Sequence, residues 1–511
     1  MNDQAAGVAP DSAGPESVER SIIEPRPRAG IATHYLRYSF SNGIVMLAGF
    51  ITFPILTRLL DNTQFGILRY YETMMLLGVA VFKLGAPHAI VRFYPYEGGL
   101  RKQRAFATNL VVLPMALSIA LWATVATGVG VWAWTGDHTF SPLLWCALAM
   151  IPMLACINII QSVVRAGERS DIVMATRISG RMAELVLVLA AVILVQQSAW
   201  AVFGGRIAAA VLLLSWLAYW MYRNVHAARV AVDWRAVRTG LAYGLPLMAH
   251  EIAFSMLANM DRVLLKHLTG DFAAVGIYAI GYSLAMQLNV FIDVTLSEAF
   301  NPAVTRAYET GGAVAVRALK ERVLLPMTYA VVAIVGMLLV CGHDLLVALS
   351  GPSKAASGEV FVIVGMSVSL YAMFAIANYG LQLEKRTMAV LVITLGAALL
   401  NIGMNFLLIP RMGYMGAAWS TAISYGALCI AQFAICPKGL ARLPDARSGT
   451  IALISLALLL VVARGTDLFG LEDTWARLGT AAVLFLVLYA LPVLLLDPRI
   501  RTMLLSLRKP H

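Results

Sequence analysis

Residues 106–133 read FATNLVVLPMALSIALWATVATGVGVWA, an apolar stretch without Asp, Glu, Lys or Arg. The hydrocarbon core of a bilayer is about 30 Å thick, and roughly 20 helical residues cross it. This stretch is therefore long enough to span a membrane as a helix. The chain has 511 residues, of which 60% are hydrophobic and 13% charged, so it can supply many such stretches. The composition predicts a polytopic membrane protein rather than a soluble fold.

Further stretches of the same kind fill the chain and are separated by short polar links. Together with residues 106–133 they predict an all-α polytopic membrane protein with about 14 transmembrane helices. The other predicted spans are 36–58, 67–91, 142–164, 172–196, 199–221, 240–261, 273–297, 323–345, 360–383, 387–409, 414–436, 449–463 and 479–496.

The polar links differ in their positive charge. Arg101, Lys102 and Arg104 follow the second span, whereas residues 61–64, between the first two spans, contain neither Lys nor Arg. The same alternation repeats along the chain. Because positively charged links stay preferentially on the cytoplasmic side, both termini are predicted to be cytoplasmic. Residues 1–34 lack the apolar run of a cleaved signal peptide and are predicted to form a disordered tail.

The longest polar gap within the helical region lies after the sixth span. It divides the core into two blocks of six spans with the same orientation, which predicts two pseudo-symmetric six-helix lobes. The sequences FGIL at 65–68 and VGIY at 275–278 mark similar points in the two blocks. Duplicated halves of this kind are typical of transporters with a substrate cavity between the halves. The predicted parts are a tail at 1–34, an N-terminal lobe at 35–223, a cytoplasmic linker at 224–239, a C-terminal lobe at 240–436, and an additional helix pair with a cytoplasmic tail at 437–511.

Several function classes lack the residues they need. The net charge of +11 comes from basic residues at helix ends rather than from one patch, so no nucleic-acid partner is predicted. The five cysteines lie in apolar spans without a CxxC pair, and no metal site is predicted. The chain has no GxxxxGK[ST] motif for ATP. No predicted outer link exceeds about 20 residues, which leaves no room for the catalytic loop of a membrane glycosyltransferase or polymerase.

Four motifs occur in a specific order over about 400 residues. They are ILTRLLDNTQFGI at 55–67, GAPHAIVRF at 85–93, DRVLL at 261–265 followed by VGIY at 275–278, and IPRMGYMGAA at 409–418. In combination they resemble the polysaccharide-exporter, or O-antigen-type flippase, branch of the multidrug/oligosaccharidyl-lipid/polysaccharide (MOP) flippase superfamily.

The resemblance implies a flippase that moves an undecaprenyl-diphosphate-linked oligosaccharide across the bacterial inner membrane by alternating access, for surface polysaccharide biosynthesis. It implies no covalent chemistry and no cofactor. A coupling ion, H⁺ or Na⁺, or the membrane potential would drive the transport. The expected partners are the lipid-linked oligosaccharide, membrane lipids, and the polysaccharide polymerase and glycosyltransferases of the same pathway.

A diphosphate that crosses hydrocarbon needs a hydrated cationic cavity, so ionisable residues within the predicted spans are the candidate site residues. Arg69 and Lys83 are about four helical turns apart and project from nearly one face of their span. The substrate-binding candidates are Arg69, Lys83, Arg177, Arg181, Arg206 and His250. The ion-coupling candidates are Glu184, Glu251 and Asp293, and the gate or helix-end candidates are Arg58, Asp261 and Arg262.

Each candidate also has a purely structural interpretation. Arg69 is three residues from Glu72 and can pair with it, and Lys83 can extend toward the cytoplasmic surface. Arg177, Arg181 and Glu184 share one helical face and can neutralise one another. Arg206 has no carboxylate at helical pairing distance, so it has a partner on another helix or faces water or substrate.

Two other transport functions stay open. A multidrug or cation antiporter of the same superfamily needs an acidic cavity in the first half, where only Glu72 and Glu184 are available. A peptidoglycan-precursor lipid flippase is compatible with the additional helix pair.

Overall fold

The computed structural model describes residues 31–96, 99–135, 141–225, 231–295, 300–465 and 473–506. Within these ranges the chain is helical apart from short turns and contains no β-strand. Twelve of the described helices are long and apolar enough to cross a membrane. Two more helices, Ser170–Leu194 and Phe272–Thr295, have the length of a span, and the first carries more charged residues than the 18-residue apolar stretch of any of those twelve does. The predicted polytopic all-α fold with about 14 helices is confirmed.

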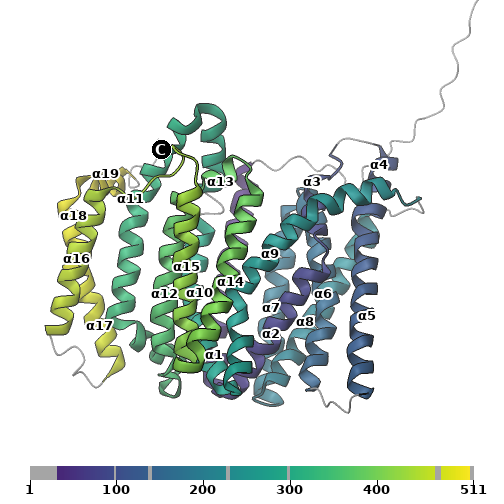
Figure 1. Ribbon diagram of the computed structural model, residues 1–511, viewed down its shortest axis with the longest axis horizontal. Coiled ribbons are helices and arrows are strands. Elements are labelled where there is room, and N and C mark those ends of the chain that lie inside the picture. The colour runs from purple at the N-terminus through teal and green to yellow at the C-terminus, as the bar shows by residue number, and fades with distance from the viewer. Residues whose placement is uncertain are drawn as a thin grey trace, which may run out of the picture.

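The helices form two lobes and an additional helix pair, arranged in one row (Figure 1). The N-terminal lobe contains α1 (Ile31–Leu59), α2 (Asn62–Phe82), α3 (Ala86–Arg92), α4 (Leu100–Phe106), a π-helix η1 (Ala107–Val112), α5 (Leu113–Thr135), α6 (Pro142–Ala166), α7 (Ser170–Leu194) and α8 (Ala199–Asn224). The C-terminal lobe contains α9 (Trp234–Thr269), α10 (Phe272–Thr295), α11 (Asn301–Ser350), η3 (Pro352–Lys354), α12 (Ser357–Ala377), α13 (Gly380–Leu383), α14 (Thr387–Met412) and α15 (Tyr414–Ile435). The pair contains α16 (Ala446–Gly465), α17 (Thr474–Phe485), a π-helix η5 (Leu486–Ala490) and α18 (Leu491–Leu496), followed by α19 (Pro498–Ser506).

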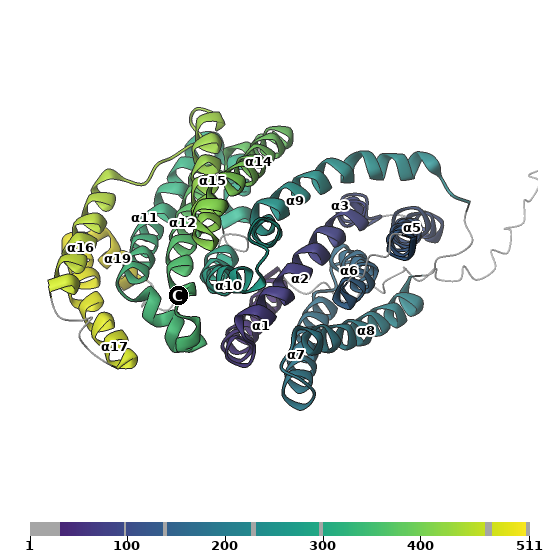
Figure 2. The same ribbon diagram turned by 60° about the horizontal axis from the view of Figure 1, so that its bottom comes forward.

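The two lobes meet mainly through α2, which packs against α9 and α10 (Figure 2). The closest approach lies at the start of α2 and α10. A Cβ atom on Gly66 would lie 1.9 Å from the carbonyl oxygen of Phe272, and one on Gly276 would lie 1.8 Å from that of Asn62. Only glycine fits at either position. Both glycines belong to the FGIL and VGIY motifs, so the repeat detected in the sequence is also the crossing point of the lobes.

Four predicted elements differ from the structure. The second span is broken at residues 83–85, where Leu84 and Gly85 have φ values of 52° and 66°, and it forms α2 and α3 instead of one helix. The seventh span begins at Trp234, so residues 234–239 of the predicted linker are helical. The ninth span extends backward to Asn301 with a kink at Gly312. The tenth span, 360–383, is broken at residues 378–379 into α12 and the short α13. Residues 1–30 of the predicted tail lie outside the described residues, and α1 already begins at Ile31.

The additional helix pair is attached to α11 by an apolar cluster that includes Val340, Leu459 and Ala481. Polar contacts reinforce this attachment at one end. The hydroxyl of Tyr329 on α11 donates to Asp497 Oδ2 at 2.9 Å, and Arg499 donates to Asp497 at 3.0 Å. Arg499 also donates to Asp445 at 2.9 Å, immediately before α16. The fully buried Asp497 thereby connects α11 with both ends of the pair.

Replacing Asp497 by Asn is expected to lower the free energy of unfolding at pH 7 by about 1.5–3 kcal/mol, the contribution of hydrogen bonds to a charged group. Burial acts to raise the pKa of Asp497, but hydrogen bonds from Arg499 and Tyr329 outweigh it and leave this pKa below its ordinary value. A carboxylate with a lowered folded pKa stabilises fully above its unfolded pKa of about 3.9 and loses that contribution as the pH falls through the folded pKa. Thermal unfolding in detergent should therefore show a gap between variant and native protein that closes below about pH 4.

The matched control is Asp473→Asn on the same helix pair. Asp473 caps α17 by accepting from the backbone of Trp475 and Ala476, and Asn caps helices equally well. This variant should unfold like the native protein at pH 7. A gap for Asp497→Asn that widens in acid would contradict the assignment.

Candidate functional site

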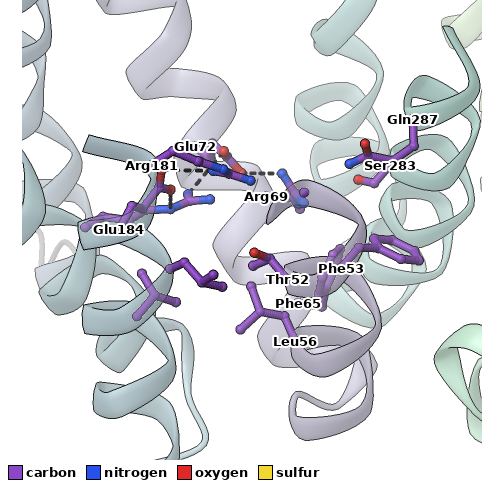
Figure 3. A pocket seen from close by; sticks show the side chains of 14 residues that line it. Thr52, Phe53, Leu56, Phe65, Arg69, Glu72, Arg181, Glu184, Ser283 and Gln287 are labelled. Carbon is purple, nitrogen blue, oxygen red and sulfur yellow. Dashed lines mark hydrogen bonds and ion pairs between the residues drawn. The ribbon is translucent and has the colours of Figure 1, made fainter. Parts of the chain in front are cut away.

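A polar cavity lies between the N-terminal lobe and α10 of the C-terminal lobe (Figure 3). It has a volume of about 200 Å³ and is lined by α1, α2, α7, α8 and α10. A neighbouring cavity of about 520 Å³, lined by α1, α2, α6, α7 and α8, shares four charged residues with it. These shared residues are Glu72, Arg181, Glu184 and Arg206. The two cavities therefore meet at one group of charges.

Five of these charged side chains form a continuous series of ion pairs. Arg69 contacts Glu72 at 2.8 Å, Glu72 contacts Arg206 at 3.1 Å, Arg206 contacts Glu184 at 3.2 Å, and Glu184 contacts Arg181 at 2.9 Å. We call this series the N-lobe charge chain. Arg206 has two carboxylate partners, while Arg69 and Arg181, at the ends, have one each.

Two features bring the residues of the N-lobe charge chain together: their spacing along each helix and the close packing of neighbouring helices. Arg69 with Glu72 and Arg181 with Glu184 are pairs three residues apart, which lie on one helical face. Arg206 comes from α8, which packs closely on α7 at Gly205. A Cβ atom on Gly205 would lie 2.7 Å from the Cα atom of Val188. Because glycine allows this approach, the next residue, Arg206, reaches Glu184 one turn earlier on α7.

The charge chain has an excess of positive charge. Three arginines and two carboxylates leave a net charge of +1, and Arg177, which lines the larger cavity, raises it to +2. Arg177 donates to Asn42 Oδ1 on α1 at 2.8 Å. Charges inside a membrane are costly unless they are paired or hydrated. An excess of cations around an open cavity is therefore suited to bind an anion.

The C-terminal lobe contributes a different kind of lining. The C-terminal lobe lines the smaller cavity with two described residues, Ser283 and Gln287 on α10, and both are uncharged. Figure 3 shows them across the cavity from Arg69. The guanidinium of Arg69 itself lies 5.0 Å from the ring centroid of Phe65.

A second charged cluster lies between the lobes, where α2 ends and α3 begins. Lys83 and His88 of the N-terminal lobe both contact Glu251 of α9, and His88 Nε2 lies 3.5 Å from Glu251 Oε2. His250 is adjacent on α9, with its Nδ1 atom unpartnered among the described residues. Lys83 therefore pairs across the interface instead of extending to the surface. None of the described residues Lys83, His250 and Glu251 lines either cavity.

A third polar cluster surrounds Asp261, which is fully buried in the C-terminal lobe. Its carboxylate accepts from Asn405 at 2.6 Å, Thr421 at 2.8 Å and Tyr278 at 2.5 Å. No described Lys, Arg or His pairs with it. Asn401 lies one turn from Asn405 and accepts from its amide at 3.1 Å. The amide oxygen of Asn405 has no partner among the described residues.

The Asp261 cluster contains one carboxylate and several neutral oxygen atoms from α9, α10, α14 and α15. Oxygen donors of this kind suit a hard cation. No group of three or more His, Cys, Asp or Glu side chains that could hold a metal occurs within the described ranges.

The gate and helix-end candidates have different surroundings. Helix α9 continues to Thr269, about two turns beyond Asp261 and Arg262, so the predicted position of these two residues at a helix end is wrong. Arg262 donates to Asn259 at 2.8 Å and stacks 4.5 Å from the ring centroid of Tyr282. Arg58 bridges the lobes by donating to the carbonyls of Ala348 at 2.6 Å and Leu349 at 2.9 Å. Its role as a gate stays a prediction, and the side chain of Asp293 lies outside the described residues.

Four of the candidates predicted from the sequence therefore belong to the N-lobe charge chain, and Arg177 lies beside it. The four are Arg69, Arg181, Glu184 and Arg206. Their roles stay predictions. From the sequence, Glu72 was identified as a partner of Arg69 and as a carboxylate available to an antiporter, but not as a site candidate, and neither Ser283 nor Gln287 was selected. Glu72 carries a usable signal, since it is a carboxylate within a predicted span. Ser283 and Gln287 carry none, because uncharged polar residues are common in such spans.

A family model described as "Polysaccharide biosynthesis protein" matches residues 34–308, more than half of the chain. The chain belongs to this family. The matched range contains most of α1, all of α2 to α10 and all residues of the N-lobe charge chain. A further relative is "Lsg locus putative protein 1" of Haemophilus influenzae, which is 23% identical over 360 residues, covering 66% of this chain and 84% of that protein.

Solved structures show the same fold at low sequence identity. A "Lipid II flippase MurJ, inward closed conformation" has a TM-score of 0.66 and 10% identity, covering 89% of this chain and 97% of that one. An inward-facing "multidrug resistance MATE family transporter of the MOP superfamily" has a TM-score of 0.56 and 14% identity, covering 85% and 99%. The predicted membership of a polysaccharide biosynthesis family is confirmed by the family model, and the chain is a multi-pass membrane protein with the fold of these two solved structures.

Proposed function

We propose that the protein is a flippase for an undecaprenyl-diphosphate-linked oligosaccharide and works by alternating access in a bacterial inner membrane. The observation that carries the proposal is the N-lobe charge chain with Arg177. Its net charge of +2 balances the two negative charges of a diphosphate diester. Arginine is the side chain best suited to phosphate because its planar guanidinium donates several hydrogen bonds at once.

The family membership supports a substrate on a polysaccharide pathway. The charge of the cavity speaks against the antiporter alternative, because an organic cation would be repelled by a site with more arginines than carboxylates. In this proposal both termini are cytoplasmic, and the substrate is delivered and used by glycosyltransferases and a polymerase of the same pathway. The lipid-linked oligosaccharide carries its prenyl tail in the surrounding lipid while the diphosphate passes the charge chain.

The proposed coupling ion binds at Asp261. A carboxylate buried among neutral donors is costly unless it takes up a proton or a cation. The cluster joins α9, α10, α14 and α15, so its occupancy affects how these helices pack. Asp261 was not among the ion-coupling candidates from sequence. Of those candidates, Glu184 and Glu251 are both paired with cationic side chains.

The test is a transport assay in proteoliposomes with the full chain. We expect transfer of a fluorescent undecaprenyl-diphosphate oligosaccharide between leaflets, measured by its accessibility to a membrane-impermeant quencher. Empty vesicles and vesicles with an unrelated membrane protein are the controls. Efflux of organic cations without any transfer of the lipid-linked sugar would contradict the proposal in favour of the antiporter. Transfer of a peptidoglycan precursor alone would instead support the related lipid flippase.

A further inference from the structure

The cavity described above is built by both lobes, and the two lobes contribute different chemistry. The N-terminal lobe supplies the arginines and carboxylates, whereas Ser283 and Gln287 of α10 supply the polar lining from the other lobe. These two residues are four apart, so they lie on one helical face about 5–6 Å from each other. They face Arg69 across the cavity (Figure 3).

Ser283 and Gln287 have unused hydrogen-bonding capacity. Neither side chain has a hydrogen-bond partner among the described residues, although both line a polar cavity. A hydroxyl and a carboxamide together provide donors and acceptors without charge. Such groups match the hydroxyl and amide groups of a sugar, while a diphosphate is bound more strongly by the arginines opposite.

The position of Gln287 is restricted by the neighbouring helix. Its amide lies against Gly49 of α1, where a Cβ atom would come within 3.3 Å of both Gln287 Nε2 and Oε1. Gly49 itself lines the same cavity. A side chain at position 49 would therefore displace the amide without removing it.

We propose that Ser283 and Gln287 are specificity-determining residues that bind the sugar next to the diphosphate. This inference rests on the proposed function. It adds that the two lobes recognise different parts of the substrate. The diphosphate is held by Arg69 and the rest of the charge chain, and the first sugar by α10 of the opposite lobe. A glycosylated substrate then contacts both lobes, whereas a carrier without sugar contacts one. A ligand shifts a conformational equilibrium only through differential contacts, so only the glycosylated carrier can favour one lobe arrangement through α10.

The experiment compares two probes in proteoliposomes. The first is the undecaprenyl-diphosphate oligosaccharide pool extracted from the native host, and the second is undecaprenyl diphosphate without sugar. Gln287→Ala is expected to slow transfer of the glycosylated probe about three- to tenfold, the effect of one or two lost hydrogen bonds, and to leave the sugar-free probe unchanged. Gly49→Ala keeps the amide but displaces it, so its effect on the glycosylated probe should be smaller and in the same direction. Gln382→Ala, on an exposed site of α13, is the matched control and should change neither rate.

Each other outcome has a distinct meaning. Equal slowing of both probes by Gln287→Ala would overturn the proposal and assign Gln287 to lobe movement. Unchanged transfer of the glycosylated probe in both Gln287→Ala and Ser283→Ala would overturn it as well. If the native protein transfers neither probe, the proposed function itself fails, which separates that failure from a failure of the sugar assignment.

Discussion

Arg206→Ala is expected to slow transfer of the lipid-linked substrate about 10- to 100-fold, the effect of losing charged hydrogen bonds of about 1.5–3 kcal/mol. Arg206 is the central member of the N-lobe charge chain and bridges Glu72 and Glu184. Its removal leaves two neutral pairs, Arg69 with Glu72 and Arg181 with Glu184. The net charge of the site, with Arg177 included, then falls from +2 to +1, which no longer balances a diphosphate. The transfer assay in proteoliposomes measures this effect.

A second substitution tests whether net charge is the cause. Glu184→Gln in the Arg206→Ala background restores the net charge to +2 and leaves the amide able to bond Arg181. Transfer should recover at least partly in this double variant. Arg206→Lys keeps the charge but cannot bridge two carboxylates as a guanidinium does, so an intermediate rate is expected. A double variant as slow as Arg206→Ala would show that the position of Arg206, rather than the charge balance, binds the substrate.

Much of the fold follows from the sequence because the bilayer imposes it. Spans need about 20 apolar residues, and the alternation of positive links orders them, so all-helical architecture and helix number are predictable. The ends of individual helices were harder to predict where local backbone conformation or packing against other helices determines them. The break after Lys83 depends on left-handed residues at 84 and 85, and α9 extends past Asp261 because its outer turns pack on α2 and α10.

The candidate site was predictable where its pairs are local. Arg69 with Glu72 and Arg181 with Glu184 follow from helical spacing. The contact between Arg206 and Glu72 joins residues far apart in the chain, and no periodicity indicates it. It requires α8 to pack against α2 as well as against α7, where the missing Cβ of Gly205 allows close approach. The Asp261 cluster likewise combines residues from four helices, of which α14 and α15 are far from α9 and α10 in the sequence. The sequence alone therefore did not show that Asp261 is buried among polar side chains rather than placed at a helix end.

Asp261→Asn is expected to remove the dependence of transport on an ion gradient. Native protein should transfer substrate faster when a Na⁺ or H⁺ gradient is imposed, and the variant should respond to neither gradient. The physical reason is that Asn is nearly isosteric with Asp but has no charge to attract a cation and no proton to exchange. Because Asp261 is fully buried and lies outside both cavities, substrate binding to the charge chain should be unchanged.

Thermal unfolding gives an independent readout of the same site. A ligand that binds only the folded state raises its stability by RT ln(1 + [L]/Kd), about 2.7 kcal/mol at a hundredfold excess over Kd. If Na⁺ is the ion, the unfolding temperature of native protein rises with Na⁺ relative to choline, and Asp261→Asn abolishes the rise. Thr421→Val removes one oxygen and keeps the carboxylate, so it should weaken the response without eliminating it. A gradient response that persists in Asp261→Asn would move the coupling site to another carboxylate, with Glu251 at the lobe interface as the next to test, because its contacts with Lys83 and His88 join the two lobes.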